Sequence, residues 1–111
     1  MAANIGIFGT EQEALDGLVE RLVAAHSPRS VWLFGSRARG DSEPDSDYDL
    51  LVVVDDAKLA KDPYSIKKPV LGLGVACDVF PCSTSGFDDA AEMVGTLCNI
   101  VKHEGRRLYA R

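Results

Sequence analysis

The clearest pattern of hydrophobic and polar positions lies between residues 10 and 26, where apolar residues recur at helical spacing. They form one apolar face, which is typical of an amphipathic helix packed on a core: Leu15, Leu18, Val19, Leu22 and Val23. Thr10 and Glu13 have the spacing of a capping box, in which side chains bind free amides of the first turn. Ser27-Pro28 ends the predicted helix, because proline disfavours helical geometry in the residue before it.

Three further apolar runs have the length of strands. Residues 30–34 are a short β-prone apolar run, as in a strand that is buried on both faces of a sheet. Residues 47–54 form a second strand that ends in an uninterrupted apolar stretch. Residues 73–81 give a third strand, closed by Pro81.

The remaining segments predict short helices. One lies near residues 64–68 within a charged surface excursion. A second begins at Thr84 or Ser85 and is broken by Gly95, and a third, which Thr96 can cap, covers residues 97–104. The tail from Arg106 is ambiguous. This order of elements predicts an α/β fold in which a small mixed sheet of three or four strands has flanking helices.

Length, composition and charge narrow the class of protein. The chain has 111 residues, which predicts a single domain over residues 1–111. It is 46% hydrophobic with a net charge of −5, from 12 basic and 17 acidic residues, so neither disorder nor a freestanding nucleic-acid binder fits. No run approaches the roughly 20 apolar residues of a membrane span, and no signal peptide is evident. Three cysteines suggest no disulfide framework, so we expect a cytoplasmic protein without a membrane or direct nucleic-acid partner.

The candidate chemistry is concentrated in the polar, Gly- and Asp-rich connection between the first two predicted strands. Asp47 and Asp49 lie two apart at the start of the second strand, so both carboxylates point to the same face. Like charges that close repel each other unless a cation lies between them. Oxygen ligands without nearby His or Cys favour Mg²⁺, with Mn²⁺ as an alternative, over zinc. Two such ions could activate an attacking oxygen and stabilise a leaving pyrophosphate.

Two other features extend this candidate site. Asp78 stands inside the apolar third strand, where an unpaired carboxylate is costly to bury, and it would complete a three-carboxylate metal site. Gly35 lets the backbone approach a phosphate closely, and the amide and hydroxyl of Ser36 can donate to it. Arg37 and Arg39 are candidate phosphate ligands or solvated surface charges.

These residues also allow other interpretations, and Asp78 could lie at a strand edge and face solvent. Paired Asp residues also flank ordinary turns, so Asp47 and Asp49 alone would not define a site. Gly35 and Gly40 have the glycine spacing of a P-loop, but Asp41 stands where that motif needs lysine, and a carboxylate there would repel phosphate.

Gly-Ser, ten residues and Asp-x-Asp together resemble the signature of the nucleotidyltransferase superfamily related to DNA polymerase β. The fuller string from Gly35 to Leu50 looks like the minimal nucleotidyltransferases of bacteria and archaea. The resemblance implies a polymerase β-like fold and a nucleoside triphosphate held by Gly35 and Ser36. It also implies metal ions bound by Asp47 and Asp49. Asp78 would bind the first metal or act as the general base on the acceptor hydroxyl.

Minimal members of this family are also similar to antitoxins that act on a small helical ribonuclease toxin of the HEPN class. The resemblance implies transfer of AMP from ATP to a tyrosine of such a toxin. Two alternatives stay open: an antitoxin that neutralises its partner by binding alone, and a nucleotidyltransferase that modifies a small molecule.

Overall fold

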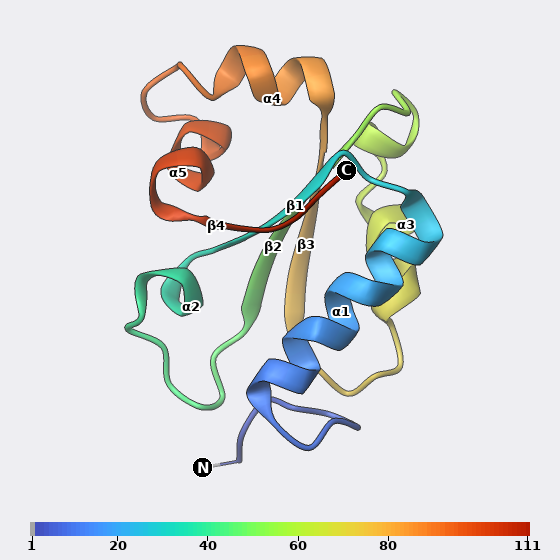
Figure 1. Ribbon diagram of the computed structural model, residues 1–111, viewed down its shortest axis with the longest axis vertical. Coiled ribbons are helices and arrows are strands. Elements are labelled where there is room, and N and C mark those ends of the chain that lie inside the picture. The colour runs from blue at the N-terminus through green and yellow to red at the C-terminus, as the bar shows by residue number, and fades with distance from the viewer. Residues whose placement is uncertain (1) are drawn as a thin grey trace.

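The structure, a computed structural model, describes residues 2–111; Met1, which the predicted domain includes, lies outside them. Figure 1 shows the elements along the chain. In order they are α1 (Glu11–His26), β1 (Ser30–Phe34), α2 (Ser36–Arg39), β2 (Tyr48–Val54), α3 (Pro63–Lys67), β3 (Cys77–Ser83), α4 (Thr84–Ala90), α5 (Leu97–Glu104) and β4 (Arg106–Ala110). Two short 3₁₀ turns flank α3, at Leu59–Lys61 and Lys68–Val70.

Helix α1 forms as its hydrophobic pattern predicts. The hydroxyl of Thr10 accepts a hydrogen bond from the amide of Glu13 at 3.1 Å, and the Glu13 carboxylate accepts one from the amide of Gly9. The helix ends at Ser27, whose left-handed backbone (φ 45°) lets its amide donate to the carbonyl of Val23. Its buried face packs into the core, so the predicted helix over residues 10–26 is confirmed to within one residue.

The four strands form one mixed sheet in the order β3-β2-β1-β4. β1 pairs antiparallel with both β2 and β4, whereas β2 and β3 are parallel. The ambiguous tail is therefore an edge strand. The predicted mixed sheet with flanking helices is confirmed.

The third strand is displaced from its predicted position of residues 73–81. Gly72 and Gly74 have left-handed backbones (φ +83° and +74°), so the chain turns there and the strand begins at Cys77. It continues through Pro81 to Ser83 because β3 is an edge strand, where a residue without an N–H costs no ladder hydrogen bond on the open side.

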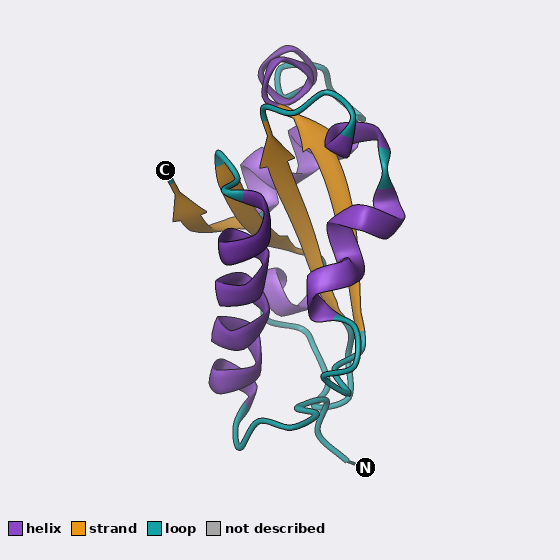
Figure 2. Cartoon of the chain, turned by 90° about the vertical axis from the view of Figure 1, so that its right-hand side faces the viewer, coloured by secondary structure: helices purple, strands orange, loops and turns teal. Residues whose placement is uncertain are grey.

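The core lies on both faces of the sheet. α1 and α3 cover one face, where Leu18 and Ile66 pack against strand residues such as Leu50. On the other face Val101 of α5 packs with Phe34, Leu51 and Val53 (buried, at most 9% exposed). Figure 2 is viewed from the side of α1 and α3 and shows helices both in front of and behind the strands.

Two of the shorter helices agree with their predictions, whereas α2 forms inside the segment expected as a polar connection and α4 ends at Ala90, before the expected break at Gly95. α3 lies in the predicted excursion, and α5 begins after Thr96, whose hydroxyl accepts from the amide of Asn99 at 3.1 Å. α4 is capped by Ser83 instead of Thr84 or Ser85. Within residues 2–111 no helix is long and apolar enough to cross a membrane, and the three cysteines are free thiols.

Candidate active site

The turn after β1 brings Gly35 against the first acid of β2. Gly35 has φ +73° and ψ −156°, a backbone conformation that is essentially restricted to glycine. A Cβ added there would overlap Oδ2 of Asp49 and lie 3.2 Å from its Cγ. The sequence suggested glycine for a close approach to phosphate; the structure adds that it admits the Asp49 carboxylate. Ser36 follows as the first residue of α2, where helical amides have no partner within the helix.

Two of the three predicted acids lie at the starts of adjacent strands. In register, Asp49 of β2 is paired with Phe34 of β1 on one side and with Asp78 of β3 on the other, so they share one face. Because side chains alternate along a strand, Asp49 lies on the same face of the sheet as Leu51, the face opposite α1.

Two details of the predicted acids need correction. Asp47 does not lie on the strand, because β2 begins at Tyr48; it ends the preceding loop and is exposed. Asp78 is the second residue of the edge strand β3 and is exposed, so it carries none of the burial cost expected from its apolar neighbours. Of the three acids, only Asp49 is partly buried.

The charges of the three carboxylates act on one another. Partial burial raises the pKa of Asp49, and the nearby charges of Asp78 and Asp47 raise it further, whereas Arg39 opposes the shift. This is the like-charge conflict that the sequence predicted, and a divalent cation would relieve it. The donor set is oxygen only, which fits Mg²⁺ or Mn²⁺ in chemistry. As their side chains stand, residues 2–111 contain no group of three or more His, Cys, Asp or Glu that could hold a metal ion.

Arg37 is engaged by its own chain. Its Nε donates to the carbonyl of Ser46 at 3.0 Å, and Nη2 donates to the carbonyls of Ser46 and Pro44 at 2.8 and 3.0 Å. Nη1 pairs with Glu11 at 3.0 Å, and the guanidinium lies 4.0 Å from the ring centre of Tyr48. With its side chain 8% exposed, Arg37 holds the loop before β2, and its role as a phosphate ligand stays a prediction.

Comparison with known proteins identifies the family. The model of the nucleotidyltransferase domain matches residues 15–105, which is most of the chain and includes the Gly35–Ser36 turn and all three acids. The chain belongs to the nucleotidyltransferase domain family. A search of curated proteins gives no significant match.

Two solved structures share the fold of this nucleotidyltransferase domain. A putative nucleotidyltransferase from Sulfolobus solfataricus aligns with a TM-score of 0.58 and 23% identity, over 85% of this chain and 75% of that one. A toxin-antitoxin solved with AMP-PNP aligns with a TM-score of 0.56 and 20% identity, over 84% of this chain and 71% of that one. At these identities the likeness concerns the fold.

Arg39 is the remaining predicted phosphate ligand of the nucleotidyltransferase domain. Its side chain is 47% exposed and pairs loosely with Asp41 at 3.2 Å, so unlike Arg37 it is open to solvent. It also lies close enough to Asp49 for its charge to lower that residue's pKa. Arg39 is therefore the cation of the predicted set that an anionic substrate could reach.

Asn4 contacts the candidate site although no sequence pattern marks it. Asn4, in the segment before α1, makes hydrogen bonds to both loops that lead into β2 and β3. A single polar residue in an irregular terminal segment carries no pattern that would single it out, and its partners are 42 and 72 positions away.

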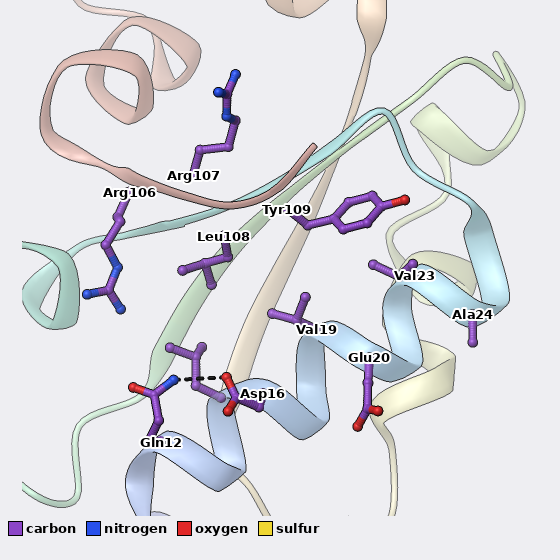
Figure 3. Close-up of a pocket in the computed structure, with 11 residues that line it drawn as sticks. Gln12, Asp16, Val19, Glu20, Val23, Ala24, Arg106, Arg107, Leu108 and Tyr109 are labelled. Carbon is purple, nitrogen blue, oxygen red and sulfur yellow. Dashed lines mark hydrogen bonds between the residues drawn. The ribbon is translucent and has the colours of Figure 1, made fainter. Parts of the chain in front are cut away.

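A groove of the nucleotidyltransferase domain lies away from the candidate site. It has a volume of about 720 Å³ and runs between α1 and the edge strand β4 (Figure 3). Its lining includes Val19, Val23, Leu108 and Tyr109, and it contains none of the predicted site residues. Because these side chains pack with the core on the α1 face, the groove is on the opposite side of the sheet from Asp49.

Proposed function

We propose that this chain is a Mg²⁺-dependent nucleotidyltransferase that moves AMP from ATP to a protein acceptor. The observation that carries the proposal is the pairing of Asp49 with Asp78 beside the Gly35–Ser36 turn, in a chain of the nucleotidyltransferase domain family. When bound, two Mg²⁺ ions, or Mn²⁺ in their place, would neutralise phosphate charge and stabilise the leaving pyrophosphate.

The proposed reaction is an in-line displacement at the α-phosphate. The acceptor oxygen forms a bond to the α-phosphorus, the bond from that phosphorus to the oxygen bridging to the β-phosphate breaks, and pyrophosphate leaves. The protein contributes mainly positioning and fixed charge. No group has to form a covalent intermediate with the nucleotide.

In this proposal the residues have distinct roles. Gly35 and Ser36 would hold the triphosphate, with Arg39 as the accessible cation. The three acids Asp47, Asp49 and Asp78 would hold the ions. Because Asp78 is exposed on the outer strand, it is also the acid that an acceptor hydroxyl could reach, so it is the candidate for taking the acceptor's proton.

For the acceptor we propose a tyrosine on a HEPN ribonuclease toxin, with this chain as the antitoxin. Support comes from the sequence resemblance to antitoxin-type minimal nucleotidyltransferases. It also comes from the fold shared with a toxin-antitoxin that was solved with AMP-PNP, an analogue of ATP.

The test is a transfer assay with α-labelled ATP, Mg²⁺ and lysate of the source cell. The Asp47→Asn/Asp49→Asn variant should lose transfer, because it removes both carboxylates of the motif. The matched control is Asp88→Asn/Asp89→Asn, which removes two exposed carboxylates from α4 and should keep full transfer. A labelled protein band that depends on Asp47 and Asp49 would support the proposal and give the acceptor's mass.

Other outcomes would change the conclusion. Label in a small molecule would keep the chemistry and replace the acceptor class. Full transfer by the Asp47→Asn/Asp49→Asn variant would refute the assigned site.

A second candidate function is neutralisation of a toxin by binding alone. It is favoured by the absence, within residues 2–111, of a carboxylate group already arranged to hold a metal ion. Toxin protection at one-to-one stoichiometry without ATP would support this function, whereas ATP-dependent protection at lower stoichiometry would support the enzyme.

A further inference from the structure

Asn4 joins two loops that are far apart in the sequence. Its Nδ2 donates to the carbonyl of Ser46 at 3.0 Å and to the carbonyl of Ala76 at 2.7 Å. Its Oδ1 accepts from the amide of Ala76 at 2.7 Å. The side chain thus binds both backbone groups of Ala76, as a neighbouring strand would, while also holding Ser46.

The backbone of Asn4 adds to this bridge. Its amide donates to the carbonyl of Pro44 at 2.9 Å, and its carbonyl accepts from the hydroxyl of the buried Tyr48 at 3.1 Å. The same segment is fixed further along, where the amide of Ile7 donates to the carbonyl of Leu73 at 3.0 Å. Asn4 therefore lies in a segment that several hydrogen bonds hold against the rest of the domain.

The two bridged residues lie one and two positions before acids of the candidate site. Ser46 precedes Asp47, and Ala76 lies two positions before Asp78. Since Asp47 lies outside β2, the sheet ladder does not fix its backbone, and the contacts to Ser46 do so instead. One end of the bridge thus sets the position of Asp47 and the other sets the start of the strand that carries Asp78.

The contacts of Arg37 show what Asn4 adds. Arg37 ties the carbonyls of Pro44 and Ser46 to the turn that contains Ser36, but makes no hydrogen bond to the loop before β3. Asn4 reaches the same two carbonyls and extends the connection to Ala76. One hydrogen-bonded network thereby links the Gly35–Ser36 turn, the loop that ends at Asp47 and the strand that carries Asp78.

We propose that Asn4 is a positioning residue of the metal site, which sets the position of Asp47 relative to Asp78 by bridging Ser46 and Ala76. The inference rests on the proposed function, because it takes these three acids as the metal ligands. Asn4 itself touches neither substrate nor metal. Its effect should therefore appear in metal binding as well as in turnover.

The test uses the full chain and Mn²⁺ as the probe, titrated by electron paramagnetic resonance in the absence of nucleotide and acceptor. Asn4→Ala should weaken Mn²⁺ binding by about tenfold, the low end of the effect of residues that orient metal ligands. Amide exchange at Ala76 should become faster, because its acceptor is lost. Asn4→Ser is the milder variant if Asn4→Ala does not fold, since a hydroxyl is too short to reach both Ser46 and Ala76.

The matched control is Asn99→Ala. This substitution removes the hydrogen bond of 2.8 Å that the side chain of Asn99, in α5, donates to the carbonyl of Ala91. It should lower the unfolding temperature and leave Mn²⁺ binding unchanged. If a folded Asn4 variant binds Mn²⁺ as tightly as the parent while Ala76 exchanges faster, the bridge is only structural and the inference is overturned. A parent protein that binds no Mn²⁺ would overturn it as well. A parent that binds Mn²⁺ but transfers no nucleotide would refute the proposed function, and the comparison of Asn4 with Asn99 would still decide this inference.

Discussion

Replacing Gly35 with alanine should damage both the fold and the acid site, for two separable reasons. The backbone at Gly35 (φ +73°, ψ −156°) is one that residues with a side chain rarely adopt. The added methyl group would also overlap the Asp49 carboxylate, because its Cβ falls on Oδ2 and 3.2 Å from Cγ. Either the carboxylate moves or the turn does.

The size of each effect can be worked out from this geometry. The backbone strain costs about 1–3 kcal/mol. Forcing the methyl group into occupied space costs about 1–3 kcal/mol more. Gly40, at the other end of α2, is the matched control: its φ is +85°, but a Cβ there would meet nothing within 4 Å. Gly40→Ala should therefore cost only the left-handed strain, about 1–2 kcal/mol.

The assay is urea unfolding of the parent, of the single variants Gly35→Ala, Gly40→Ala and Asp49→Ala, and of Gly35→Ala combined with Asp49→Ala. If the overlap is real, Gly35→Ala should cost less in the Asp49→Ala background, with a coupling of at least about 1 kcal/mol. The slope of free energy against urea should stay constant, so that midpoints report stability. Equal losses for Gly35→Ala and Gly40→Ala, together with a coupling near zero, would show that Gly35 and Asp49 do not meet as described.

Four other substitutions test the rest of the site and the core. Arg37→Ala should lower the free energy of unfolding by about 2–4 kcal/mol, because charge-assisted hydrogen bonds and the contact with Tyr48 are lost. Arg39 is exposed, so the free energy of unfolding of Arg39→Ala should stay within about 0.5 kcal/mol of the parent. Equal losses of stability in the two variants would contradict the assigned roles. The pKa of Asp49 is raised above its ordinary 3.8 by burial and by neighbouring carboxylates, so its ionisation weakens folding as the pH rises through that pKa. Asp49→Asn should therefore have a higher urea midpoint than the metal-free parent at pH 7, with a difference that shrinks toward pH 4; a constant difference would exclude this cause. Leu18→Ala, at a fully buried position, should cost about 2–5 kcal/mol by urea unfolding, and a loss below 1 kcal/mol would mean that α1 is not packed on the sheet as described.

Sequence reasoning succeeded where the signal is local. The α1 helix and the α5 helix follow from apolar spacing and from caps at Thr10 and Thr96, because capping is set by neighbouring residues. It was less accurate where the secondary structure of a segment depends on contacts with residues far away in the sequence. The third strand extends past Pro81 because it lies at the sheet edge, and the tail became β4 because β1 offered a free edge.

The roles of the site residues divide in the same way. The motif picks out Gly35, Ser36 and the acids, and their roles as nucleotide and metal ligands stay predictions. Arg37 was a candidate phosphate ligand by its position in the motif. Its partners Pro44 and Ser46 are known only from the folded loop, and they use the donors that a phosphate would need.

The sequence by itself determined the class of fold, the caps of α1 and α5 and the segment that carries the candidate chemistry, because hydrophobic period and short motifs depend on residues within a few positions of one another. Only the tertiary structure decided that Asp49 and Asp78 stand side by side, that Gly35 must lack a side chain, and that Asn4 bridges the two loops. These relations depend on strand order and on contacts between residues up to 72 positions apart. No local pattern records such contacts, because they exist only after the sheet has formed.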